Sequence, residues 1–176
     1  MYELRSWIPF EKLDLQALST NPNAIDLLEE NPDKINWSFL SLNPNAIHLL
    51  EKNPDKIDGF RLCDNPNAIE LIEKIMEKRL LKDETQSLSL YNRFKYSEWA
   101  FLSRNPNAIP ILEKYPNKIN LHWLTTNLNP EIIPMLEKDK KSDYYWVNIS
   151  KNPGLIPYIE KNLHMIEWKY LSGNPN

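Results

Sequence analysis

A five-residue motif, Asn-Pro-Asn-Ala-Ile, recurs along the 176-residue chain and constrains its fold more than any other feature. The motif begins at Asn21, Asn43, Asn65 and Asn105. The first two intervals are 22 residues, and the third is 40, which equals one period plus an insertion of 18. Degenerate copies begin at Asn129 and Asn152. A period of this length is typical of an array in which each unit packs on its neighbours.

The period sets the domain organisation that we predict. One repeat domain covers residues 1–176, with a half-unit at 1–20 and six repeats over 21–173. Residues 174–176, Asn-Pro-Asn, read as the opening of a further repeat, so we expect an uncapped C-terminal end that could pack on a second copy.

Each unit carries two apolar segments. The first follows the motif, as in Ile25, Leu27 and Leu28, and the second has apolar residues three apart, as in Trp37 and Leu40. Such spacing suits short helices, and helices this short are stable only when packed on neighbours. We therefore predict an all-α fold, a right-handed α-solenoid of about six two-helix repeats, each with a short α-helix and a short α- or 3-10 helix.

Prolines and caps indicate where these helices begin. Three copies have proline directly after the motif's isoleucine, and proline is tolerated only in the first turn of a helix. This places the cap of the first helix at the motif's second asparagine and its first residue at the alanine, as in Asn23 and Ala24. The second helix is predicted to start at a cap such as Asn36, Asp58 or Asn120.

An insertion at about 75–94 interrupts the period. Residues 75–82 contain no proline or glycine and predict an extension of the first helix by about two turns. We expect a loop at 83–86 and a further short helix at 87–94. Excursions of this kind are often the functional part of a repeat protein.

Residues that support catalysis or cofactor binding are sparse, so we expect a non-enzymatic protein without a cofactor or metal. The histidines, His48, His122 and His164, occupy different positions of the repeat and lack zinc-ligand spacing. Cys63 stands where most other copies have serine, and we interpret it as a small buried residue rather than a nucleophile. The three glycines are too far apart to form a phosphate-binding loop.

Two polar columns recur in the units. A glutamate column, at Glu29, Glu51, Glu73, Glu113, Glu137 and Glu160, could bind cations, but we interpret it as facing water or bracing the next unit. The first asparagine of each motif predicts a ladder that bonds turn backbone between units, with a binding role as the alternative.

The most variable column lies between the core positions of the second helix. We call it the aromatic column, and it consists of Ala17, Phe39, Arg61, Phe101, Trp123, Asn148 and Tyr170. Exposed aromatics with an arginine are typical of protein interfaces, so Phe39, Arg61, Phe101, Trp123 and Tyr170 are candidate partner-binding residues. The alternative is that these side chains pack between adjacent units or under loops.

Net charge and hydropathy limit the classes of partner and the cellular compartment that we expect. The net charge of −3 predicts no overall attraction to nucleic acid or anionic membranes. No apolar run approaches the roughly 20 residues that span a bilayer. A single cysteine and an N-terminus without a signal-peptide pattern predict an intracellular protein that is not secreted.

The repeat itself supports a family resemblance. The stretch from Asn43 to Asp58, with the opening Trp7-Ile8-Pro9-Phe10, resembles the repeats of uncharacterised proteins encoded by giant DNA viruses of the mimivirus and chlorella-virus kind. The resemblance implies a viral α-solenoid, in the host cytoplasm or the virion, with no enzymatic residues to carry over. A weaker likeness is to the variant leucine-rich repeats, which alternate α- and 3-10 helices.

Three functions remain open from the sequence. The first is a scaffold for protein–protein interaction, and the second is a structural component of a virion or viral assembly. The third, an enzyme on a helical array, has no supporting residues. Oligomeric state is also open, with a homodimer through the C-terminal end as one outcome.

Overall fold

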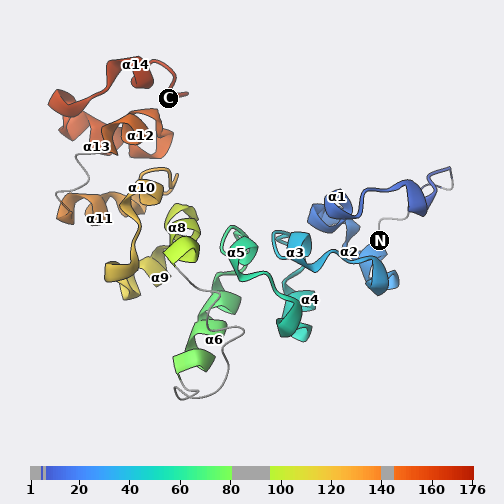
Figure 1. Ribbon diagram of the computed structural model, residues 1–176. Coiled ribbons are helices and arrows are strands. Elements are labelled where there is room, and N and C mark those ends of the chain that lie inside the picture. Colours follow the sequence, from blue (N-terminus) through green and yellow to red (C-terminus); the bar gives the residue numbers. More distant parts are fainter. Residues whose placement is uncertain (1–4, 6, 81–95, 140–144) are drawn as a thin grey trace. The chain divides into compact units, whose positions relative to one another are not determined.

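The computed structural model describes residues 5, 7–80, 96–139 and 145–176 (Figure 1). These residues form helices and turns, and no strand occurs among them, so the predicted all-α class is confirmed. The chain divides into two compact units, Met1–Arg93 and Phe94–Asn176.

The first unit alternates short α-helices with single 3-10 turns. In chain order it contains η1 (Phe10–Lys12), α1 (Leu15–Thr20), η2 (Pro22–Ala24), α2 (Ile25–Glu30), η3 (Pro32–Lys34), α3 (Trp37–Leu40), α4 (Ile47–Lys52), η4 (Pro54–Lys56), α5 (Gly59–Leu62) and α6 (Ile69–Leu80). Figure 1 shows α1, α3 and α5 in one row and α2, α4 and α6 in another.

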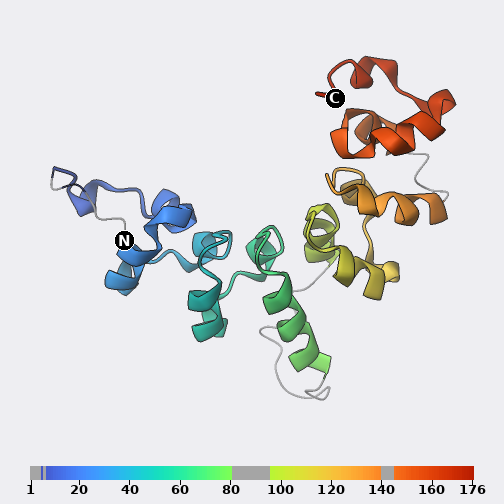
Figure 2. The same ribbon diagram turned by 180° about the vertical axis from the view of Figure 1, so that it is seen from behind.

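The second unit follows the same alternation. It contains α8 (Tyr96–Arg104), α9 (Ile109–Lys114), η5 (Pro116–Lys118), α10 (Leu121–Leu124), η6 (Pro130–Ile132), α11 (Ile133–Lys138), α12 (Trp146–Lys151), η8 (Pro153–Leu155), α13 (Ile156–Lys161), η9 (Leu163–Met165) and α14 (Trp168–Leu171). Figure 2, from behind, shows the second helices α8, α10, α12 and α14 as one row.

A third helical element separates the two predicted helices of a repeat. After α2, Asn31 leaves the helical region with φ −129°, and Pro32 opens the 3-10 turn η3, closed by Lys34 N–H donating to Asn31 O at 3.0 Å. Because this turn takes three residues, α3 is left with only four.

The predicted cap of the first helix is wrong. Helix α4 begins at Ile47, one residue later than expected, and its cap residue Ala46 makes no side-chain bond. Asn45 instead donates its side-chain amide to Pro22 O of the preceding repeat, at 3.0 Å. Its own N–H is bonded to Asn43 Oδ1, also at 3.0 Å. The first asparagine therefore closes the turn, which leaves the second free to join two repeats.

The placement of the three prolines in a first turn and the helix extension predicted for the insertion are confirmed where the structure describes them. Pro110, Pro134 and Pro157 all lie in the first turn of their helices. Helix α6 is 12 residues long, against six in α4, so the insertion extends the first helix. The loop predicted at 83–86 and the helix predicted at 87–94 lie outside the described residues.

The fifth repeat divides the role of the first asparagine between two residues. Asn129 begins the motif as predicted, since its Oδ1 accepts from Glu131 N–H at 2.9 Å and α11 begins four residues later, at Ile133. The ladder position is taken by Asn127, whose Nδ2 donates to Ser103 O and Asn105 O, at 2.9 and 3.0 Å. Leu128 follows this ladder asparagine in place of a proline and is 59% exposed. Asn129 Nδ2 also makes the bond of the second asparagine, donating to Pro106 O at 2.9 Å.

The core is built from the same positions in each repeat. Fully buried side chains come from both helices of a repeat, at Leu28, Leu40, Leu50, Leu62 and Ile72 in the first unit and Leu102, Leu112, Leu124, Leu136 and Ile149 in the second. The motif alanines Ala46, Ala68 and Ala108 are also fully buried, which explains why a small residue stands there. Cys63 is buried, as predicted.

Candidate interaction surface on the second helices

Within each of the two units, a ladder of asparagine side chains joins a repeat to the one before it. Asn43 Nδ2 donates to Ser19 O and to Asn21 O, both at 2.9 Å. Asn65 repeats these bonds one period later, to Ser41 O at 3.0 Å and Asn43 O at 2.8 Å. The predicted ladder is therefore present, and its rungs are buried.

In four repeats, a serine at the end of the second helix fixes the start of the next second helix. Ser41 Oγ donates to Trp37 O at 2.9 Å and accepts from Asp58 N–H at 3.0 Å. Equivalent bonds, 17 residues apart in sequence, join Ser19 to Asn36, Ser103 to Asn120 and Ser150 to Glu167. The sequence analysis missed this role, although the recurrence of serine at this position was the signal. Helices α3, α5, α10 and α14, which carry four of the column residues, are thus fixed at their starts.

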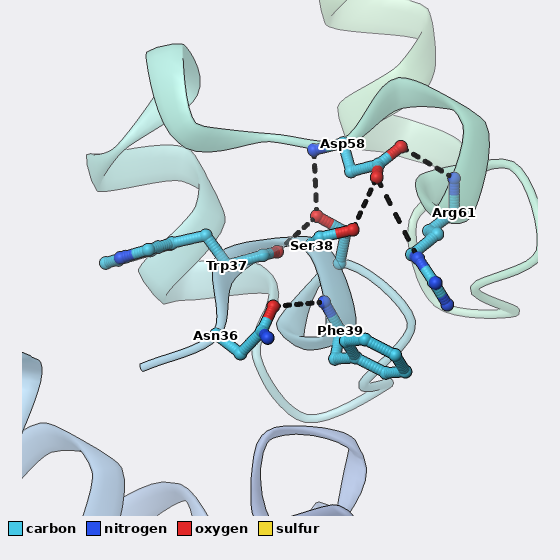
Figure 3. A network of polar contacts seen from close by, with 7 residues as sticks. Asn36, Trp37, Ser38, Phe39, Asp58 and Arg61 are labelled. Atoms are coloured by element: carbon cyan, nitrogen blue, oxygen red, sulfur yellow. Dashed lines mark hydrogen bonds and ion pairs between the residues drawn. The ribbon is translucent and has the colours of Figure 1, made fainter. Parts of the chain in front are cut away.

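In the first unit, the aromatic column brings Phe39 and Arg61 together. The guanidinium of Arg61 lies over the Phe39 ring, with 4.0 Å between Cζ and the ring centroid. Asp58 holds it there, with its Oδ2 3.8 Å from Arg61 Nε (Figure 3). The same carboxylate accepts from Ser38 Oγ at 2.5 Å and caps α5 through Arg61 N–H. The positive charge of Arg61 is therefore compensated within the unit.

In the second unit, the column brings Phe101 and Trp123 together. Their rings stack with centroids 5.9 Å apart and an interplanar angle of 22°. Arg104 Cζ lies 4.6 Å from the Phe101 centroid and 5.2 Å from that of Trp123. Further along, Lys151 Nζ lies 4.5 Å from the Tyr170 centroid. Ring stacking and cation–π contacts therefore hold these side chains within the unit.

The five candidate residues are all partly exposed, and each contacts another side chain of the unit. Packing between adjacent second helices, the alternative raised from the sequence, is therefore observed for Phe39 with Arg61 and Phe101 with Trp123. Partner binding through the same residues stays a prediction. The sequence analysis missed Arg104 and Lys151, which stand three residues after column positions and so lie on the same helix face.

The glutamate column braces neighbouring repeats, as interpreted from the sequence. Glu29 Oε1 lies 2.8 Å from His48 Nε2, and Glu51 Oε1 lies 2.8 Å from Lys74 Nζ. Hydrogen bonding to Glu51, together with its negative charge, raises the pKa of Lys74 above the ordinary value of 10.5. Within the described ranges, no group of three or more His, Cys, Asp or Glu side chains could hold a metal ion.

Comparisons with models of known protein families, with curated proteins and with solved structures find no match. Among the described helices, none is long and apolar enough to cross a membrane.

Proposed function

We propose that the chain is a non-enzymatic scaffold that binds a protein partner through the aromatic column. The observation that supports this most is the partial exposure of Phe101, Trp123 and Tyr170, the last two on helices whose starts are fixed by partly buried hydrogen bonds. Aromatic and arginine side chains carry much of the binding energy in protein interfaces. Anchors on rigid helices lose little conformational entropy on binding, which favours a specific contact.

We also propose that the repeats stack as a right-handed α-solenoid of viral origin, located in the host cytoplasm or the virion. The recurrence of the asparagine bonds at separations of 22 and 24 residues in both units supports the stacking. The viral origin rests on the resemblance of the repeat motif.

Affinity capture with the full chain tests the binding role. We expect the intact protein to retain partner proteins that Trp123→Ala and Tyr170→Ala both lose, because each removes a large partly exposed ring. Glu113→Ala, at an exposed position of α9, is the matched control and should retain them. Circular dichroism would verify that the helices persist. Capture of the same proteins by all four chains would refute the proposal.

A structural role through self-association is the second candidate, and one observation favours it. Trp168 on α14 is 66% exposed, and nearby Leu163 is 59% exposed. The equivalent Trp37 of the first unit is half-buried, with Lys56 Nζ 4.4 Å from its ring centroid. We propose that a second copy covers Trp168. Light scattering should then show a dimer that Trp168→Ser dissociates, and a monomer at all concentrations would exclude it.

A further inference from the structure

We infer that the second copy covers Trp168 with its N-terminal end, so that chains associate head to tail. The inference rests on the self-association proposed above and adds the surface of the second copy that makes the contact. It depends on the hydrogen-bonding groups that join neighbouring repeats within each unit.

Within a unit, the part that stacks on its neighbour is a second helix with the asparagine turn that follows it. We call this a ladder segment, and the first two run over residues 14–23 and 36–45. In the second of these, the donors are the Asn36 N–H and the side-chain amides of Asn43 and Asn45. Their acceptors in the first segment are Ser19 Oγ and the carbonyls of Ser19, Asn21 and Pro22.

The last ladder segment, 167–176, offers the same acceptors with no donor on them. They are Ser172 Oγ and the carbonyls of Ser172, Asn174 and Pro175, which we call the acceptor face. None of the described residues donates a hydrogen bond to these four oxygens. The segment itself is held as an internal one is, since Ser172 Oγ donates to Trp168 O at 2.9 Å and Asn174 Nδ2 donates to Ser150 O at 3.0 Å.

The first ladder segment offers the matching donors. They are the Asp14 N–H and the side-chain amides of Asn21 and Asn23, which we call the donor face. All three residues are exposed, and no described residue accepts a hydrogen bond from these groups. The Asn21 amide is already oriented, because its Oδ1 accepts from Asn23 N–H at 3.0 Å, the same turn bond as in an internal segment.

In two internal repeats, the tryptophan of a second helix is covered by the repeat that follows. Trp146 on α12 stacks on Tyr158 of α13, with centroids 5.6 Å apart, and is only 4% exposed. Trp37 on α3 has Lys56 Nζ of η4 at 4.4 Å from its ring centroid. Trp168 stands at the same position of α14 but is 66% exposed.

The described residues before the donor face, 5 and 7–13, match what covers the internal tryptophans. Their 3-10 turn η1 carries Lys12 at the position that Lys56 has in η4. Trp7, just before this turn, is 73% exposed. Trp7 and Trp168 are the two most exposed large apolar side chains of the described residues, so burying them together stabilises the contact.

A column of core leucines is also incomplete at both faces. The second-helix position that is fully buried at Leu40, Leu62 and Leu124 is only partly buried at Leu18 and Leu171. Docking of the donor face on the acceptor face continues this column from one copy to the next.

A symmetric pair of acceptor faces would place carbonyls against carbonyls, and buried acceptors without donors destabilise an interface. The donor face of a second copy satisfies them with the bonds that join internal repeats. Because the two faces differ, a dimer leaves one of each open, and association can continue to larger rings or filaments.

Sedimentation velocity of the full chain over a range of concentrations tests the inference. The donor-face variant combines Asn21→Asp with Asn23→Asp, because aspartate keeps the oxygen that closes the turn but has no amide donors. Three intermolecular hydrogen bonds are lost, so the dissociation constant of self-association should rise about a hundredfold. Asn117→Asp, at an exposed position where two other repeats carry aspartate, is the matched control and should associate as the unaltered chain does. Circular dichroism would check that each variant is folded.

Mixing two variants distinguishes head-to-tail from symmetric association. Trp168→Ser weakens the acceptor side and the donor-face variant weakens the donor side, so each alone should stay monomeric where the unaltered chain associates. In an equimolar mixture, one chain supplies an intact donor face and the other an intact acceptor face. A heterodimer that does not grow with concentration should therefore form, detected through a dye on one variant.

The inference is overturned if the donor-face variant associates as the unaltered chain does, or if the equimolar mixture stays monomeric. An equal loss from Asn117→Asp also overturns it, since the effect is then one of added charge alone. If Trp168→Ser is monomeric in these cases, the proposed self-association survives with another surface of the second copy as the contact. An unaltered chain that is monomeric at all concentrations rejects the self-association itself, and the inference with it.

Discussion

At the scale of the residue, the first asparagine of the motif uses every hydrogen-bonding group of its side chain. In Asn65, Oδ1 accepts from Asn67 N–H at 3.0 Å, and Nδ2 donates to Ser41 O and Asn43 O. The amide has one acceptor and two donor hydrogens, so all are satisfied in a fully buried position. Aspartate lacks the donors, which explains why asparagine recurs here.

Asn65→Ala should therefore destabilise the chain strongly. The substitution removes three hydrogen bonds and leaves two buried carbonyls without these donors, at a cost of about 3 kcal/mol. Urea unfolding monitored by circular dichroism would measure the loss. Asn21→Ala is the matched control, because Asn21 is exposed and its side chain closes the turn by accepting from Asn23 N–H, so about 1 kcal/mol is expected. Equal losses of unfolding free energy in the two variants would contradict a stabilising role for the ladder bonds of Asn65.

The ladder was predictable from the sequence, and the capping arrangement was not. Recurrence of asparagine at one position indicates a shared backbone partner in adjacent units. Recurrence alone does not show which of two asparagines, two residues apart, closes the turn. That depends on the carbonyls of the preceding repeat, such as Pro22 O, which receives the Asn45 amide. These become defined only when the repeats are packed.

At the scale of the element, the position of a residue in the first helix determines whether its substitution by proline is tolerated or destabilises the helix. Helix α6 begins at Ile69, so Glu70 lies in its first turn, where N–H groups have no helical acceptor. Glu70→Pro should change the free energy of unfolding by less than about 1 kcal/mol. Glu73→Pro, in the helix interior, should cost about 3 kcal/mol or more because it removes a hydrogen bond and clashes with the preceding turn. Thermal unfolding of the two variants would compare them, and similar melting temperatures would place the helix start elsewhere.

Element boundaries followed from the sequence wherever a side chain marks them. Asn36, Asp58 and Asn120 cap their helices, each accepting from an N–H three residues on. The ladder asparagine of the fifth repeat, Asn127, was not predicted, because Leu128 replaces the proline that follows this asparagine in other repeats. The hydrogen bonds of Asn127 survive that replacement, since they do not involve the side chain at 128.

At the scale of the whole molecule, the ladder and serine bonds join neighbouring repeats. These bonds connect residues 17 to 27 apart in sequence. In such an array, stability depends on each repeat and its immediate neighbours, so damage stays local.

Hydrogen exchange followed by mass spectrometry would test this locality. Asn65→Ala should speed amide exchange in α3 to α6, whose repeats the Asn65 bonds join. Exchange in α12 to α14 of the second unit should stay unchanged. Leu136→Ala, at a fully buried core position of α11, is the reciprocal variant and should affect the second unit first. Uniformly faster exchange along the chain would indicate a single cooperative core instead.

The candidate surface was predictable in position but not in chemistry. The position of the aromatic column follows from the sequence period, because the column lies between two core residues of fixed spacing. The pairing of Arg104 with Phe101 and Trp123 does not follow from the period, since no other repeat carries arginine at that position. The irregular residues therefore distinguish the two units.

The asparagine ladder also has an evolutionary consequence. Within the described residues of each unit, a repeat offers backbone carbonyls on one side and an asparagine amide on the other, so these junctions are chemically alike. A gene segment encoding one period can be duplicated or deleted without leaving a junction whose donors lack acceptors. Even the lengthened fifth repeat keeps its junction, because Asn152 still reaches Thr125 O and Asn127 O. Recombination can therefore change the number of repeats while point mutation changes the exposed column independently.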